Sequence, residues 1–117
     1  MRVEQRVFRV ATREELADWL ADGVIAAPDD ETIAFHTELA EVERSADEVV
    51  LVSTIAALGR PVAVDGDALL VDEVPFEAIV LIAVANEPAR HAVRELLSLA
   101  RRDVRVVLNP PWFRPSA

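Results

Sequence analysis

The sequence predicts an α+β domain, residues 1–117, in which a mixed β-sheet carries about three helices on its faces. Three observations lead to this class. Runs rich in valine, isoleucine and leucine recur along the chain and indicate strands. Thr12 and Glu15 have the spacing of a capping box, so a helix should begin directly after the first of these strands. Apolar residues repeat at helical spacing over residues 88–101 and predict a second, amphipathic helix.

The first half of the chain divides into five segments. Residues 3–10 alternate polar and β-branched side chains and predict a strand, and the capped helix that follows ends at a glycine. Residues 24–31 predict a loop because they contain a proline followed by two aspartates. Residues 32–36 predict a short strand that ends in a histidine. Residues 37–47 are acidic with apolar positions on one side, and they predict a helix.

The second half is rich in strands. Strands are predicted over residues 48–53, 62–64, 68–71, 78–85 and 103–108. Residues 54–58 predict a single helical turn, and Asn86 and Pro88 are suited to the start of the 88–101 helix. The turn Asp65-Gly66-Asp67 joins two strands, because glycine adopts positive φ without penalty. For the final third of the chain, a ferredoxin-like sandwich is the alternative architecture.

Composition narrows the possible functions. The chain has no cysteine and only two distant histidines, so we expect no metal site and no thiol chemistry. It has no apolar run that could span a bilayer and no signal-type start, so we expect a cytoplasmic protein without membrane contact. Residues 11–80 carry 17 acids against three arginines, and the formal net charge is −9. Such a chain is repelled by phosphate backbones, so generic nucleic-acid binding is not expected, although a local arginine patch near the C-terminus is compatible with this charge.

Several segments of the chain resemble known proteins. Four segments together resemble a small bacterial family with an ADP-ribosyltransferase-like fold; they are residues 7–16, 34–37, 50–52 and 58–62. Residues 67–79 resemble the end of the DNA-targeting ADP-ribosyltransferase toxins known as DarT, beginning at their catalytic glutamate. Residues 82–84, the helix and strand that follow, and Pro111-Trp112-Phe113 continue that pattern. The resemblance implies a split, mixed sheet, NAD as substrate, and a small-molecule nucleotide as ligand.

The resemblance also implies site residues. Asp67 stands where the toxins have their catalytic glutamate and is one methylene shorter, and Asp65 is the alternative acid in the same turn. His36 matches a strand histidine of the small family and would orient the nicotinamide ribose, with Thr37 beside it in place of a cysteine. Arg9 stands where that family has another histidine. An arginine opens the catalytic series of another ADP-ribosyltransferase class, so the Arg9 guanidinium would contact either the phosphates or a ribose of NAD.

Each of these residues also has a structural interpretation. Ser53-Thr54 is similar to a Ser-Thr pair on a cofactor-binding strand of arginine-class transferases, but Thr54 could instead cap the turn that follows. Asp67 could serve only as a turn residue, His36 as a structural histidine, and Arg9 as an arginine on an exposed strand face.

Two functions follow from these residues. The first is an NAD-binding ADP-ribosyltransferase acting on an unknown acceptor, with Asp67 stabilising the charge that develops as nicotinamide leaves. The second is a catalytically lapsed member of the same fold that acts as a binding or interaction module, with a protein partner encoded nearby in a toxin or biosynthetic operon. Transfer of an RNA 2′-phosphate is a third, weaker option, which the negative charge and the scarcity of central arginines disfavour.

Overall fold

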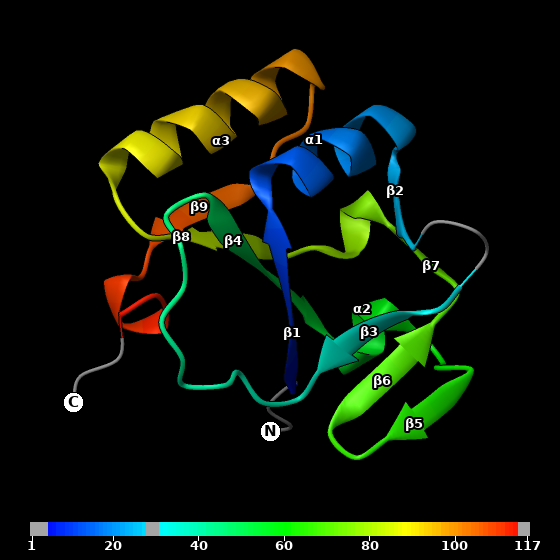
Figure 1. Ribbon diagram of the computed structural model, residues 1–117. Helices are drawn as coiled ribbons and strands as arrows, with labels where there is room; N and C mark the ends of the chain where they lie inside the picture. Colours follow the sequence, from blue (N-terminus) through cyan, green and yellow to red (C-terminus); the bar gives the residue numbers. More distant parts are fainter. Residues whose placement is uncertain (1–4, 28–30, 115–117) are drawn as a thin grey trace, which may run out of the picture.

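The computed structural model describes residues 5–27 and 31–114, and its centre is a seven-stranded sheet (Figure 1). The strand order is β5-β6-β3-β1-β4-β8-β9. The bounds are β1 Arg6–Thr12, β3 Ile33–His36, β4 Glu48–Thr54, β5 Ala63–Asp65, β6 Ala68–Val71, β8 Leu81–Val84 and β9 Arg105–Leu108. The sheet is mixed, because β8 and β9 are parallel while the other neighbours are antiparallel. The strands β2 Val24–Ala26 and β7 Glu73–Pro75 form a separate antiparallel pair.

Besides the strands, the described residues contain three α-helices and two short 3-10 helices. They are α1 Arg13–Asp22, α2 Ile55–Leu58, α3 Glu87–Leu99, η2 Phe76–Ala78 and η3 Pro110–Trp112. The predicted caps are confirmed. The Thr12 hydroxyl accepts from the Glu15 amide, and Gly23 ends α1 with a φ of 79°. Asn86 accepts from the Ala89 amide at 2.9 Å and begins α3.

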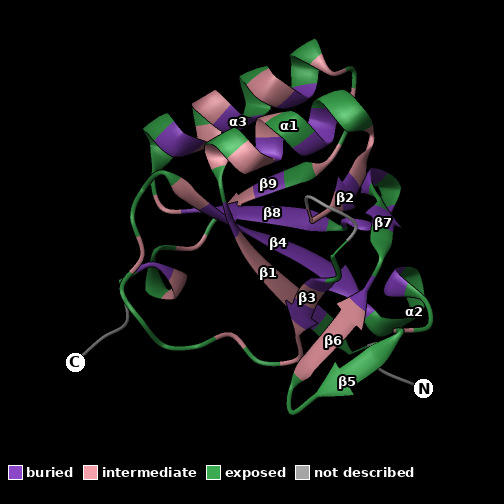
Figure 2. Ribbon diagram, turned by 45° about the vertical axis from the view of Figure 1, so that its right-hand side comes forward, coloured by how far each residue is buried: buried purple, intermediate pink, exposed green. Residues whose placement is uncertain are grey.

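Alternation along the strands divides the core between the two faces of the sheet. Helices α1 and α3 lie together on one face (Figure 1), and Leu16 of α1, Val93 of α3 and Val7 of β1 belong to the larger apolar cluster. The other face holds a smaller cluster that includes Val52 and Phe113. Figure 2 shows the central strands β4 and β8 buried along their length, whereas the edge strand β5 is exposed.

Three predictions about the fold are wrong. Residues 37–47 form no helix but an irregular segment of bends and turns that crosses the second face of the sheet (Figure 1). The predicted loop 24–31 begins with β2, which is a strand because it pairs with β7 through Ile25 and Val74. The ferredoxin-like alternative fails because β8 and β9 are direct neighbours, whereas that sandwich places another strand between the two strands of each βαβ unit.

The remaining expectations concern the ends of the chain and the membrane. The start of the predicted 3–10 strand and the Pro28-Asp29-Asp30 stretch fall outside the described residues. Within residues 5–27 and 31–114, no helix is both long and apolar enough to cross a membrane.

Candidate functional site

The sheet is split between β1 and β3. Strand β1 pairs with β4 along its whole length, from Arg6 opposite Thr54 to Thr12 opposite Glu48. It pairs with β3 through a single residue pair, Phe8 opposite His36. The two strands therefore separate on either side of this pair, and the edge of β1 that faces β3 is unpaired along the rest of its length.

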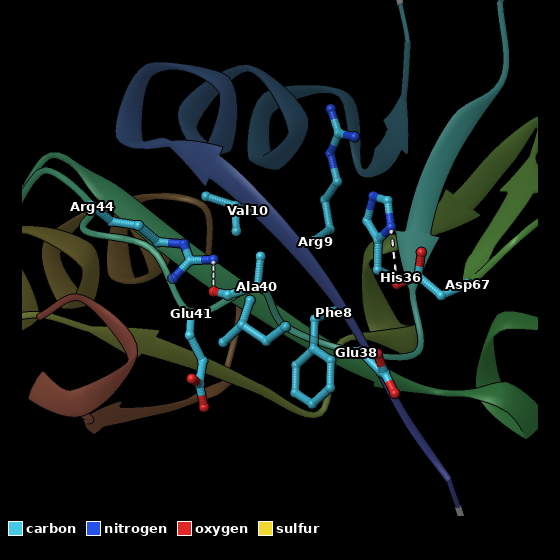
Figure 3. Close-up of a pocket in the computed structure, with 10 residues that line it drawn as sticks. Phe8, Arg9, Val10, His36, Glu38, Ala40, Glu41, Arg44 and Asp67 are labelled. Atoms are coloured by element: carbon cyan, nitrogen blue, oxygen red, sulfur yellow. Dashed lines mark hydrogen bonds and ion pairs between the residues drawn. The ribbon is translucent and has the colours of Figure 1, made fainter. Parts of the chain in front are cut away.

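A cavity of about 930 Å³ lies at this opening. We call it the β1–β3 cavity; it is lined by Phe8, Arg9, Val10, His36, Glu38, Leu39, Ala40, Glu41, Arg44 and Asp67. Three structural units supply these side chains: β1, the end of β3 with the 37–47 segment, and the β5–β6 turn. Arg9, His36 and Asp67 are far apart in sequence, and folding brings all three to this one cavity (Figure 3).

Asp67 and His36 form the acidic side of the cavity. The Asp67 carboxylate Oδ2 lies 3.5 Å from His36 Nδ1, and both side chains are about half exposed, at 48% and 45%. Asp67 ends the turn at Gly66, whose φ of 60° only glycine adopts readily. The Thr37 amide donates to the Asp67 carbonyl at 2.9 Å and fixes the turn against β3. The carboxylate is therefore held in place and remains accessible to a ligand.

Arg9 lies across the opening from His36 (Figure 3). Neighbouring residues of a strand point to opposite faces, so Arg9 points away from Phe8 and Val10. The stem of its side chain borders the β1–β3 cavity, and its guanidinium extends toward α1. There it also lines a second, smaller hollow with Asp18. Its Nη1 donates only a long hydrogen bond, 3.4 Å, to the Ala34 carbonyl, and its buried Nε has no partner among the described residues. The guanidinium thus has unused donors at the split.

The 37–47 segment forms the opposite wall, and Arg44 holds it there. The Arg44 guanidinium donates to the carbonyls of Ala40 at 2.6 Å, Val42 at 3.1 Å and Trp112 at 2.6 Å. The Arg44 amide donates to the Phe113 carbonyl at 2.9 Å. Two of these bonds satisfy the carbonyls of Ala40 and Val42, which a helix would pair internally, and the other two tie the segment to residues 112–113. The sequence contains no local signal for this arrangement, because Trp112 and Arg44 are 68 residues apart.

Comparison with known proteins identifies the fold. No protein-family model and no curated protein matches the sequence. Among solved structures, Thermus sp. 2.9 DarT in complex with NAD+ matches with a TM-score of 0.77 and 13% identity, over 96% of this chain and 98% of that one. The chain has the DarT fold. The carba-NAD+ complex of the same protein gives a TM-score of 0.75 at 13% identity, covering 97% and 100%. Its complex with ADP-ribosylated ssDNA gives 0.76 at 12%, covering 94% and 96%.

This DarT-like fold places the other two predicted site residues outside the cavity lining. Ser53 is fully buried in β4, and its hydroxyl donates to the Ala78 carbonyl at 2.7 Å. Ser53 is therefore in contact with the core and is not among the residues that line the cavity. Thr37 contributes through its backbone, as the donor that holds the Asp67 turn. Thr54 caps α2 by accepting from the Ala57 amide at 3.1 Å.

Three further charged residues line the β1–β3 cavity of the DarT-like fold and were not predicted from the sequence, namely Glu38, Glu41 and Arg44. The acids of residues 37–47 have the spacing of a solvated helix face. For this reason the sequence did not indicate that any of them would line a cavity. The cavity thus carries three carboxylates, with Asp67, against two guanidiniums, and Arg44 is occupied by backbone carbonyls. Within the described residues, no three histidine, aspartate or glutamate side chains gather as a metal site.

Proposed function

We propose that the β1–β3 cavity binds NAD+ and that the chain transfers ADP-ribose from it to a nucleophilic acceptor. The observation that carries this proposal is the meeting of Arg9, His36 and Asp67 at one cavity of about 930 Å³. Each was predicted from the sequence, and they come from separate elements of the fold. The complexes of Thermus sp. 2.9 DarT with NAD+ and carba-NAD+ support NAD+ as the ligand of this fold.

The proposed reaction breaks the bond between C1 of the nicotinamide ribose and the nicotinamide nitrogen. The bonding electron pair leaves with nicotinamide, which becomes neutral, and positive charge develops on the ribose. The acceptor then forms a new bond to C1 with its lone pair and releases a proton to water. If water is the acceptor, the product is free ADP-ribose.

Each of the three side chains has a role in this reaction. The Asp67 carboxylate stabilises the positive charge on the ribose, because a fixed anion acts strongly on charge that develops beside it. His36, 3.5 Å away, positions that carboxylate and the ribose. Arg9 donates its free N–H groups to the pyrophosphate through the split in the sheet, since guanidinium matches phosphate oxygens.

A second function, binding of NAD+ without turnover, is favoured by the length of Asp67. Aspartate is one methylene shorter than the glutamate of the toxins, and a shift of about 1 Å at a catalytic group costs roughly 10²-fold in rate. In this case the chain would be a nucleotide-binding module, and it would bind a protein partner through the bound NAD+ or through its own surface.

Calorimetry with NAD+ and chromatography of released nicotinamide test both functions. We expect binding at millimolar NAD+ or below, and release that falls by about 10²–10³-fold in Asp67→Ala. Asp65→Ala is the matched control, because Asp65 is the exposed last residue of β5, directly before the same turn, but does not line the cavity. Binding of NAD+ without release of nicotinamide would support the second function, binding without turnover. Absence of both from the unmodified chain would overturn the proposal.

A further inference from the structure

A second concave surface lies between α3 and β9, outside the β1–β3 cavity. This α3–β9 groove has a volume of about 700 Å³ and is lined by Arg90 and Arg94 of α3 together with residues 102–108. Four of its lining residues are arginines, with Arg102 and Arg105 completing the set, and Asp103 is its only acid. A groove of this charge stands out in a chain whose formal net charge is −9.

Two of the four arginines have partners and two are free. Arg90 pairs with Glu87 at 3.2 Å, and Arg102 pairs with Glu77. Arg94 and Arg105 are exposed, and within residues 5–27 and 31–114 they form no ion pair. Their charges are therefore available to an anionic partner.

Strand β9 is the last strand of the sheet, so it lines the groove with a free edge. It pairs with β8 on one side, and no strand in the described part of the chain pairs with its other side. An unpaired edge presents backbone N–H and C=O groups that an extended peptide can join as a further strand. The groove thus offers backbone pairing and positive charge together.

The lining favours a peptide over a nucleic acid. Single-stranded nucleic acids bind on aromatic side chains that stack with bases, and none of the groove's lining residues is aromatic. The net negative charge of the chain also repels a long phosphate backbone. A short acidic peptide lies mainly within the positive field of the groove arginines, which attracts it.

We infer that the α3–β9 groove binds an acidic, extended segment of a partner protein, which adds as a strand to the free edge of β9. Carboxylates of that segment pair with Arg94 and Arg105, and its backbone pairs with β9. This surface is separate from the proposed nucleotide site, so a partner can bind while the β1–β3 cavity is occupied.

Fluorescence anisotropy with a labelled peptide of alternating glutamate and valine tests this inference. We expect saturable binding to the full chain that weakens by about tenfold or more in Arg94→Glu and in Arg105→Glu. Arg60→Glu is the matched control, because it reverses an exposed arginine that does not line the groove. The same peptide N-methylated at alternate residues keeps its charge but cannot pair as a strand, so its affinity should also fall.

Two results would overturn the inference. If the arginines only protect the edge strand from self-association, both reversals will leave peptide binding unchanged. If a labelled oligothymidylate binds more tightly than the peptide and loses affinity in the same two variants, the groove is a nucleic-acid site.

Discussion

Asp67 depends on its neighbours for both its position and its exposure. The positive φ of Gly66 turns the chain, the Thr37 amide holds the Asp67 carbonyl at 2.9 Å, and His36 lies 3.5 Å from the carboxylate. None of these contacts buries the carboxylate fully, so one of its oxygens can face a ligand. A change of one methylene at this residue should therefore change the chemistry without disturbing the fold.

Asp67→Glu should raise the rate of nicotinamide release, by up to about 10²-fold, because the longer side chain brings the carboxylate closer to the ribose. Rates measured at saturating NAD+ separate this effect from a change in affinity. Asp65→Glu adds the same methylene to a residue outside the cavity lining and should leave the rate unchanged. A lower rate in Asp67→Glu would mean that the aspartate is already the right length for its role.

Among the described residues other than glycine, only Arg101 has a positive φ, at 56°. It follows the last turn of α3, where the Arg101 amide donates to Ser98 at 3.1 Å and the Arg102 amide to Leu97 at 2.9 Å. This is the Schellman pattern, and its left-handed position is usually occupied by glycine. An arginine there adopts a conformation that costs a side chain with a β-carbon roughly 1–2 kcal/mol.

Arg101→Gly should therefore raise the free energy of unfolding by about 0.5–1 kcal/mol, after the added flexibility of the unfolded chain is subtracted. Chemical denaturation measures this difference. Arg101→Ala removes the charge but keeps the β-carbon, and it should give little or none of the gain. An equal gain in both variants would assign the effect to charge.

Among the elements, the 37–47 segment shows how a site wall can form without regular structure. Its carbonyls at Ala40 and Val42 are paired by one guanidinium, which also reaches Trp112 of η3. Trp112 in turn lies edge-on to Phe8, with ring centroids 5.6 Å apart. The segment, η3 and β1 are thus joined at the cavity through Arg44 and one aromatic pair.

Arg44→Ala should weaken NAD+ binding by about tenfold, because hydrogen bonds to a charged group are worth roughly 1.5–3 kcal/mol and this wall depends on three of them. Calorimetry measures the affinity, and hydrogen exchange should show faster exchange in residues 37–47. Arg13→Ala is the control: it removes an ion pair of 2.6 Å with Asp47 at the far end of the same segment. Equal losses in the two variants would contradict a specific role for Arg44.

At the scale of the whole molecule, the acids and arginines are unevenly distributed. Residues 11–80 hold 17 acids and three arginines, whereas six of the twelve arginines fall within residues 81–117. Among the described residues, a single ion pair joins the two regions: Arg102, just after α3, pairs with Glu77 of η2. A backbone N–H at Glu77 and the Arg102 guanidinium hold the pKa of Glu77 below its usual range.

A lowered pKa in the folded state means that the Glu77 carboxylate stabilises the fold above the usual glutamate pKa of about 4.3, and that this contribution is lost as the pH falls through the lowered value. Glu77→Gln should therefore reduce the free energy of unfolding at neutral pH and have little effect in strong acid. Denaturation at both pH values measures the difference. Glu43→Gln, an exposed acid without an ion pair among the described residues, should show no such pH dependence.

The sequence by itself determined most of the elements and the residue types of the site. The Thr12 cap, the Gly23 stop and the Asn86 cap are local signals, because each is read from residues within one turn of the chain. Arg9, His36 and Asp67 were predicted from the sequence through a family resemblance, since the motif residues of a family keep their order along the chain.

Only the tertiary structure decided which of these residues meet. The split between β1 and β3 follows from a single pairing, Phe8 with His36, and no local pattern encodes where two strands stop pairing. The 37–47 wall depends on Arg44 reaching the carbonyl of Trp112, 68 residues away, so helical periodicity in this stretch predicted the wrong structure. Ser53 resembles a site residue in sequence, yet it lies in the core, because the packing of β4 turns its hydroxyl toward Ala78.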